Sequence, residues 1–153
     1  MATKVALITG ASSGIGEATA IQLSEAGYTT YGAARRVERM DHLKSLGIRP
    51  IAMDVTDDAS METGVAQIVS EAGRIDVLVN NAGYGSYGAL EDVPMSEAKA
   101  QFDVNVFGGA LLTQLVLPHM RAQRSGKIVN ITSMGGRFSM PLGAWYHATK
   151  FAL

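Results

Sequence analysis

The stretch TGASSGIG, residues 9–16, decides the fold, because it joins the apolar run KVALIT (4–9) to a helical pattern over residues 14–27. Gly10, Gly14 and Gly16 give it a G-x-x-x-G-x-G spacing. Glycines allow a tight turn and a close approach of the backbone to a ligand, and the first turn of a helix has N–H groups without partners. A strand, a glycine turn and a helix in this order can hold a pyrophosphate. The stretch therefore predicts a nucleotide-binding site.

The rest of the chain repeats the same order of strand and helix. Strands are predicted at 4–9, 28–35, 49–55, 75–80 and 126–132, and helices at 14–27, 37–46, 57–72 and 96–123. Gly27, Gly47 and Gly73 mark the ends of the first three helices. The strands are apolar almost throughout, which is typical of a parallel sheet covered on both faces. The sequence therefore predicts an α/β fold with a Rossmann-type doubly wound parallel sheet.

The number of strands is smaller than this fold requires. A full dinucleotide-binding sheet has six strands, in the order 3-2-1-4-5-6, and only five are predicted here. We therefore expect residues 1–153 to form one NAD(P)-binding Rossmann domain that is incomplete at its C-terminus and truncated after the fifth strand. On this interpretation the chain is a fragment of a longer protein.

The composition limits the possible partners. Hydrophobic residues make up 47% of the chain and charged residues 18%, with a net charge of −1, as in soluble globular proteins. Such a charge argues against binding to nucleic acid or to an anionic membrane. There is no cysteine, which suits a reducing compartment and leads us to expect a cytoplasmic protein. The three histidines, at 42, 119 and 147, lack ligand-like spacing, so no metal site is predicted.

The end of the second strand should select the nucleotide. An acidic residue there would favour NAD, but Arg35 and Arg36 occupy the place, and a guanidinium can pair with a 2′-phosphate. The pair therefore predicts NADP(H), although two solvated surface arginines would give the same sequence. Asp54 closes the third strand and either receives an adenine amino group or caps the following turn.

Further polar residues stand where a ligand would meet them. The motif NNAG (80–83) closes the fourth strand, Asn105 interrupts the long helix, and Ser133 ends the fifth strand. Tyr146 and Lys150 are four residues apart, so both side chains emerge from one face of a helix. Each motif alone also has a structural explanation. The asparagines of NNAG could join neighbouring strands, Asn105 could be a minor irregularity of the helix, and Tyr146 and Lys150 could lie on an exposed helix face.

Together, the motifs TGASSGIG, NNAG, Asn105, Ser133 and YHATK (146–150) resemble the short-chain dehydrogenase/reductase family, each in the expected order. The resemblance covers essentially the whole chain. It implies that the catalytic residues are Asn105, Ser133, Tyr146 and Lys150. It also implies cofactor contacts from Gly10, Ser12, Ser13, Gly14, Ile15, Gly16, Arg35, Arg36, Asp54, Val55, Asn81, Ala82, Gly83, Tyr146 and Lys150.

The resemblance implies an oxidoreductase that transfers a hydride between NADP(H) and a carbonyl or alcohol substrate. Tyr146 would be the general acid in reduction and the general base in oxidation. A free phenol has a pKa of about 10, and the Lys150 cation one turn away would favour the phenolate. Ser133 would orient the substrate oxygen, and Asn105 would position a water that links Lys150 to solvent. His147 points about 100° around the helix, so we expect it to be non-catalytic.

Two alternatives differ in chemistry. A catalytically silent NADP(H)-binding module or sensor would be expected to lack one of the four catalytic residues, and all four are present. A sugar-nucleotide epimerase or dehydratase of the extended branch would typically show G-x-x-G-x-x-G. The substrate cannot be identified from the sequence, although the segment 135–145 either lines an apolar cleft or packs as a loop. The resemblance also implies a homodimer or homotetramer.

Overall fold

The computed structural model describes residues 3–153 and contains a five-stranded parallel sheet in the order β3-β2-β1-β4-β5. The strands are β1 (Val5–Thr9), β2 (Thr29–Ala34), β3 (Arg49–Ala52), β4 (Val77–Asn80) and β5 (Lys127–Asn130). The chain runs outward from β1 to β3 and then returns to the other side of β1, where β4 lies. This order confirms the predicted Rossmann-type sheet. The carboxyl ends of β1 and β4 form the switch point at which such sheets bind ligands.

The helices follow the predicted alternation with two differences. They are α1 (Gly14–Glu25), a 3₁₀ helix η1 (Val37–Leu46), α2 (Asp58–Ala72), α3 (Met95–Phe102), a π-helical turn η2 (Asp103–Phe107), α4 (Gly108–Gln123), a short 3₁₀ turn η3 (Met134–Gly136) and α5 (Ala144–Ala152). The helix predicted at 37–46 is thus a 3₁₀ helix. The long helix predicted at 96–123 contains a π-helical turn in its middle, a feature that is frequent at functional sites.

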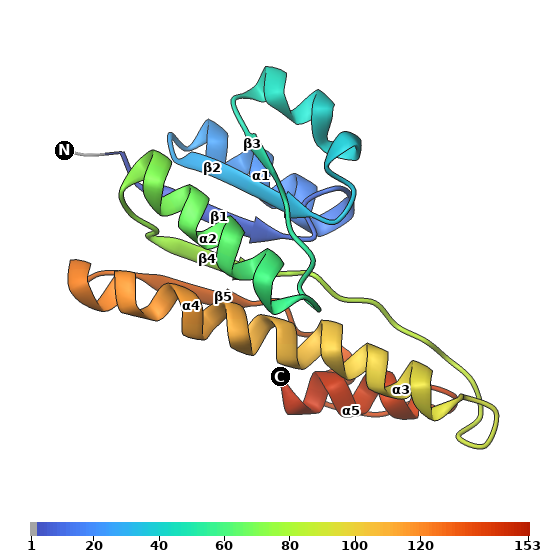
Figure 1. Ribbon diagram of the computed structural model, residues 1–153. Helices are drawn as coiled ribbons and strands as arrows, with labels where there is room; N and C mark the ends of the chain where they lie inside the picture. The colour runs from blue at the N-terminus through green and yellow to red at the C-terminus, as the bar shows by residue number, and fades with distance from the viewer. Residues whose placement is uncertain (1–2) are drawn as a thin grey trace.

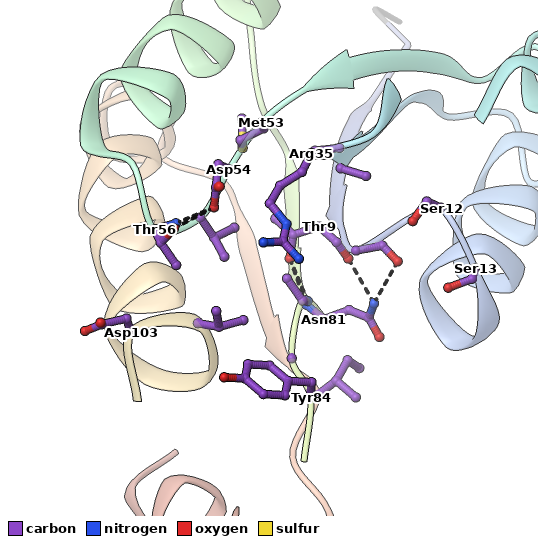
Figure 2. Close-up of a pocket in the computed structure, with 18 of the residues that line it drawn as sticks. Thr9, Ser12, Ser13, Arg35, Met53, Asp54, Thr56, Asn81, Tyr84 and Asp103 are labelled. Carbon is purple, nitrogen blue, oxygen red and sulfur yellow. Dashed lines mark hydrogen bonds between the residues drawn. The ribbon is translucent and has the colours of Figure 1, made fainter. Parts of the chain in front are cut away.

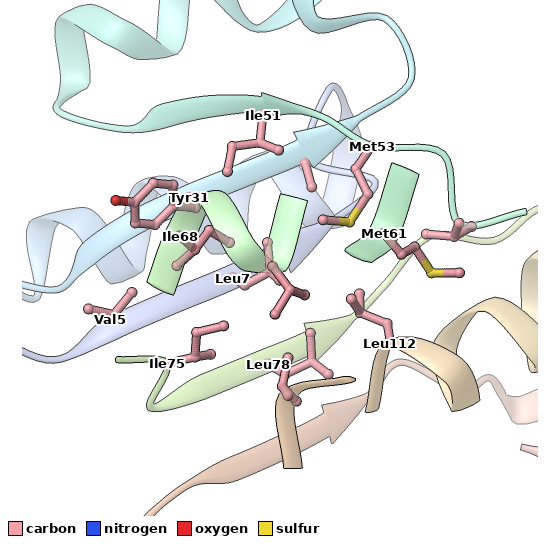
Figure 3. Packing of buried hydrophobic residues seen from close by; sticks show 14 of the residues in the cluster. Val5, Leu7, Tyr31, Ile51, Met53, Met61, Ile68, Ile75, Leu78 and Leu112 are labelled. Carbon is pink, nitrogen blue, oxygen red and sulfur yellow. The ribbon is translucent and has the colours of Figure 1, made fainter. Parts of the chain in front are cut away.

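Two hydrophobic clusters lie on opposite faces of the sheet, because side chains alternate along each strand. Val5 and Leu7 of β1 pack with α2 and α4 (Figure 3). Ala6 and Ile8 pack on the other face with residues of α1 and η1. Figure 1 shows α2 and α4 together on the side of the sheet that faces the viewer, with α1 behind β1 and β2. The strand β1 is buried on both faces, as its apolar sequence predicts.

The fifth strand does not follow the prediction of a sheet covered on both faces. β5 is the last strand in the sheet order, and Val129 is 43% exposed. It is also shorter than the predicted 126–132, and β3 is shorter than the predicted 49–55, because the chain beyond Ala52 turns at Asp54. An apolar sequence identified β5 as a strand but did not show which of its faces would be covered. No helix within residues 3–153 is both long and apolar enough to cross a membrane.

Candidate active site

The glycine loop brings the backbone of β1, α1 and β4 into close contact. Ser13 is the N-cap residue of α1, with an extended backbone, and α1 begins at Gly14. A Cβ atom on Gly16 would collide with the carbonyl group of Gly10 and with the Asn81 side-chain amide. Only glycine therefore lets the first turn of α1 lie this close to the ends of β1 and β4. The N-terminus of α1, which carries a partial positive charge, is held beside the switch point of the sheet.

An open cleft of about 820 Å³ lies at the carboxyl ends of the strands (Figure 2). It brings together most of the cofactor-binding residues predicted from the sequence. Those that line it are Gly10, Ser12, Ser13, Ile15, Arg35, Arg36, Asp54, Val55, Asn81, Ala82, Gly83, Tyr146 and Lys150. Gly14, Gly16, Asn105 and Ser133 do not line it. The glycines shape the loop, and Asn105 reaches the cleft through its hydrogen bonds to Tyr84, which lines it.

Two arginines follow β2 at the edge of the cleft. Both Arg35 and Arg36 are exposed, and Arg35 extends into the cleft between Asp54 and Asn81 (Figure 2). None of the ion pairs within residues 3–153 involves either guanidinium. Both are therefore available to an anionic group of a ligand.

Asp54 has the structural role that the sequence left open. Its Oδ1 accepts hydrogen bonds from Thr56 N at 2.9 Å and from Thr56 Oγ1 at 2.8 Å. The carboxylate thus caps the turn after β3 while it also lines the cleft. Capping fixes the orientation of the side chain and leaves a contact with adenine as a prediction.

Thr9 also lines the cleft, although it was not among the residues predicted from the sequence. Its Oγ1 accepts hydrogen bonds from the backbone N–H groups of Asn81 and Ala82, both at 3.0 Å. The Asn81 amide donates to Thr9 O at 2.9 Å. Asn80 donates to Gly109 O at 3.2 Å, so the two asparagines tie β4 to β1 and α4. The signal in the sequence was a polar residue that closes an otherwise apolar strand.

Asn105 sits in the π-helical turn and is buried. Its Oδ1 accepts from Tyr84 N at 2.9 Å, and its Nδ2 donates to Tyr84 O at 2.8 Å and to Thr149 Oγ1 at 3.0 Å. Asn105 therefore joins the segment after NNAG to α5, and both of its amide protons are used. A Cβ on Gly83 would lie 3.1 Å from Asn105 Oδ1 and 3.6 Å from Lys150 Nζ, so both side chains approach the Gly83 backbone. The water relay stays a prediction.

Tyr146 and Lys150 share one face of α5 and both line the cleft. Lys150 Nζ lies 5.9 Å from the centroid of the Tyr146 ring and donates to Ile131 O at 3.1 Å. Lys150 is buried, and this burial lowers the pKa of its ammonium group, because desolvation disfavours the charged form. The lysine is therefore held beside the aromatic ring by the carbonyl group of Ile131, the residue that follows β5.

Ser133 is the N-cap residue of η3, and its Oγ accepts a hydrogen bond from Gly135 N at 3.0 Å. A hydroxyl that accepts from the backbone keeps its own proton for another acceptor.

The ring of Tyr87, a residue that the sequence did not indicate, lies close to Tyr146, with the two ring centroids 5.5 Å apart.

The segment between Ser133 and Tyr146 exposes the apolar side chains of Phe138, Met140 and Leu142. Trp145 does not line the cleft. It lines a separate groove of about 390 Å³, together with Met95 and Phe107. Within residues 3–153 no three metal-ligating side chains are grouped.

A doubly wound sheet with a glycine-lined cleft at its switch point, closed by a Tyr-x-x-x-Lys helix, defines a nucleotide-binding oxidoreductase fold. Residues 4–153 match the family model described as short chain dehydrogenase. The chain belongs to the short-chain dehydrogenase/reductase family.

The relatives support this assignment along the whole chain. A 3-ketodihydrosphingosine reductase of Bacteroides thetaiotaomicron is 45% identical over 100% of this chain and 55% of its own length. A short-chain dehydrogenase from Streptomyces avermitilis has a TM-score of 0.95 and 44% identity, over 99% of this chain and 57% of that one. A metagenomic short-chain oxidoreductase in complex with NADP has a TM-score of 0.94 and 33% identity, over 99% of this chain and 71% of that one.

The chain thus spans about half the length of the curated relative it matches. The relatives contain further residues that have no counterpart in this sequence, and the activity, substrate and assembly of the whole protein are therefore matters for proposal.

Proposed function

We propose that the protein is an NADP(H)-dependent reductase of carbonyl compounds that also oxidises the corresponding alcohols. The observation that carries the proposal is the placement of Tyr146 and Lys150 on one face of α5, at the wall of the cleft that begins at the glycine loop. Tyr146 would be the proton donor, and the Lys150 ammonium group lies 5.9 Å from the centroid of its ring.

The residues of the cleft fit a dinucleotide. The Gly16 backbone lies so close to Gly10 and Asn81 that the N-terminus of α1 can approach a pyrophosphate. Lys150, held by Ile131 O, would bind the ribose hydroxyls beside the nicotinamide. The bound cofactor supplies the hydride.

The proton is the contribution of this chain. The Tyr146 hydroxyl donates a proton to the carbonyl oxygen during reduction and accepts it again during oxidation. The Ser133 hydroxyl, whose oxygen accepts from Gly135 N, donates to the same substrate oxygen and orients it. The positive charge of Lys150 stabilises the phenolate that forms when Tyr146 gives up its proton.

NADP(H) is proposed rather than NAD(H) because of Arg35 and Arg36. Two guanidinium groups without ion-pair partners within residues 3–153 suit a dianionic 2′-phosphate better than a free hydroxyl. The metagenomic relative in complex with NADP supports this choice.

An apolar ketone is proposed as the substrate. Tyr87, Phe138, Met140 and Leu142 are exposed near Tyr146 or in the segment that leads to it. The Bacteroides relative is named a 3-ketodihydrosphingosine reductase, which supports a ketone as the substrate. We further propose a cytoplasmic homodimer or homotetramer, which follows from the family resemblance and the composition.

The experiment is a measurement of NADPH consumption by the full-length protein. Ketones of increasing alkyl length, aldehydes, quinones and steroids would be compared at equal concentration, with NADH in parallel. We expect turnover with NADPH that is faster for long alkyl ketones than for short ones. NADPH binding without turnover of any substrate would instead favour a silent binding module, and faster turnover with NADH would contradict the cofactor assignment.

A further inference from the structure

His147 is a buried polar side chain for which the proposed chemistry has no use. It is only 3% exposed, and it lies next to Tyr146 in α5, with the two ring centroids 5.8 Å apart. Its Nε2 accepts a hydrogen bond from Met140 N at 3.0 Å, and its Nδ1 lies 3.0 Å from Gly135 O. A carbonyl oxygen can only accept, so Nδ1 carries the proton. Both partners are satisfied by one form of the ring, the neutral Nδ1–H tautomer.

The backbone around the ring leaves room for nothing larger than glycine. A Cβ on Gly135 would lie 2.8 Å from His147 Nδ1, and a Cβ on Gly143 would lie 2.6 Å from Nε2. Both distances are shorter than side-chain packing allows. The segment between Ser133 and α5 is therefore folded closely around this one side chain.

One of the two hydrogen bonds leads to Ser133. The Gly135 carbonyl is held by His147 Nδ1, while the Gly135 N–H donates to Ser133 Oγ at 3.0 Å. A shift of Gly135 would move the donor that orients the Ser133 hydroxyl.

The other hydrogen bond leads to the apolar side chains. Met140 is 55% exposed although its N–H is fixed by His147 Nε2, and Leu142 follows it with 60% exposure. Leu142 O accepts from Gly88 N at 2.8 Å, which joins this segment to the loop that carries Tyr87. The bond to Met140 thus sets the shape of the surface beside Tyr146.

We propose that His147 is a positioning residue with two separable effects. Its bond to Gly135 orients Ser133 for the chemical step, and its bond to Met140 shapes the surface that binds the apolar part of the substrate. This inference rests on the proposed function, because it takes Ser133 and Tyr146 as the groups that contact the substrate oxygen.

Two substitutions separate the bonds. In His147→Asn the side-chain amide replaces Nδ1 and reaches Gly135 O, but it is too short for Met140 N. In His147→Gln the amide oxygen replaces Nε2 and accepts from Met140 N, but it leaves Gly135 O without its donor. The same pair of changes at His119, a half-buried residue of α4, serves as the matched control.

With an alkyl ketone and NADPH as substrates, we expect one variant to change mainly kcat and the other to change mainly KM. One hydrogen bond is worth a few-fold in such constants, so we expect His147→Gln to lower kcat about fivefold with little change in KM. His147→Asn should raise KM about fivefold for a long alkyl ketone and change kcat less than twofold. Equal losses in both variants, or lower melting temperatures without a division between kcat and KM, would overturn the proposal.

A spectroscopic measurement tests the inference independently of turnover. The ¹⁵N chemical shifts of the His147 ring should show a protonated Nδ1 and an unprotonated Nε2, and the Met140 amide should exchange with solvent more slowly in wild type than in His147→Asn. A proton on Nε2 would contradict the hydrogen-bond arrangement itself. Absence of turnover by the wild-type protein would contradict the proposed function, while these two spectroscopic results would still test how His147 is bound.

Discussion

The two ends of the cleft are built in different ways. At the nucleotide end, the glycine loop lies in one short stretch, 9–16, and it offers a ligand mainly backbone groups and a helix N-terminus. Near the proposed substrate end, Asn105, Ser133 and Tyr146 come from segments far apart in the sequence, and each is proposed to act through its side chain. A backbone site spreads its binding energy over several groups, whereas a side-chain site depends on single functional groups. Single substitutions should therefore have their largest effects at the substrate end.

The largest effect is expected for Tyr146→Phe. The change removes the hydroxyl but keeps the ring that packs against Tyr87 and lies beside Lys150. Loss of a general acid should lower kcat about a thousandfold, while the dissociation constant for NADPH, measured by calorimetry, should stay within twofold. A variant that keeps more than a tenth of wild-type turnover would show that Tyr146 is not the proton donor.

A smaller but still large effect is expected when the backbone of the nucleotide end is changed. In Gly16→Ala the new methyl group would collide with Gly10 and Asn81, so α1 must move away from the pyrophosphate site. A displacement of about 1 Å can cost on the order of a hundredfold in kcat/KM. Steady-state kinetics at varied NADPH would measure the loss.

Gly14→Ala is the control for this change. A Cβ on Gly14 would meet no atom within 4 Å, and the cost is confined to the left-handed backbone, with φ of +60°. If both variants lost the same activity, close approach of α1 to the sheet would not be the reason that Gly16 is a glycine.

The charged side chains of the nucleotide end should matter less than its backbone. Replacing Arg35 and Arg36 together by alanine removes the groups proposed to pair with the 2′-phosphate. NADPH affinity should fall at least about tenfold, the usual value of a charge-assisted hydrogen bond, and NADH affinity should stay nearly unchanged. Calorimetry that finds equal losses for the two cofactors would mean that the arginines are ordinary surface residues.

The same contrast explains what the sequence could predict. Three features can be recognised from the sequence because their function requires a fixed spacing or place along the chain. They are the glycine loop, the arginines after β2 and the Tyr-x-x-x-Lys pair. The parallel arrangement of the strands follows from the alternation of strands and helices. Tyr87 and the bonds of His147 could not be predicted, because their roles depend on partners that only the folded chain brings near. For Thr9 the sequence shows a polar residue at the end of an apolar strand but not its partners after β4. The place of β5 at the end of the sheet order is, by contrast, what a sheet truncated after the fifth strand predicts.

The smallest effect is expected for the stability of Lys150→Met. Burial lowers the pKa of Lys150 in the folded protein, so the charged ammonium is less favourable there than in the unfolded chain. Below the lowered pKa the charge therefore costs stability, and this cost disappears as the pH rises past the unfolded value of about 10.4. Methionine keeps the apolar stem without the charge, although Ile131 O loses its donor.

We expect Lys150→Met to melt at a slightly higher temperature than wild type at neutral pH, with a difference that shrinks towards alkaline pH. The variant should nevertheless lose most turnover, because the Tyr146 phenolate no longer has a neighbouring cation. Thermal denaturation at several pH values, together with the NADPH assay, measures both effects. A melting temperature that falls equally at neutral and alkaline pH would show that Lys150 stabilises the fold through Ile131 O. In that case the hydrogen bond from Lys150 to the backbone would stabilise the folded protein by more than burial of the charge destabilises it. The substrate end would then be held in place by backbone contacts, as the nucleotide end is.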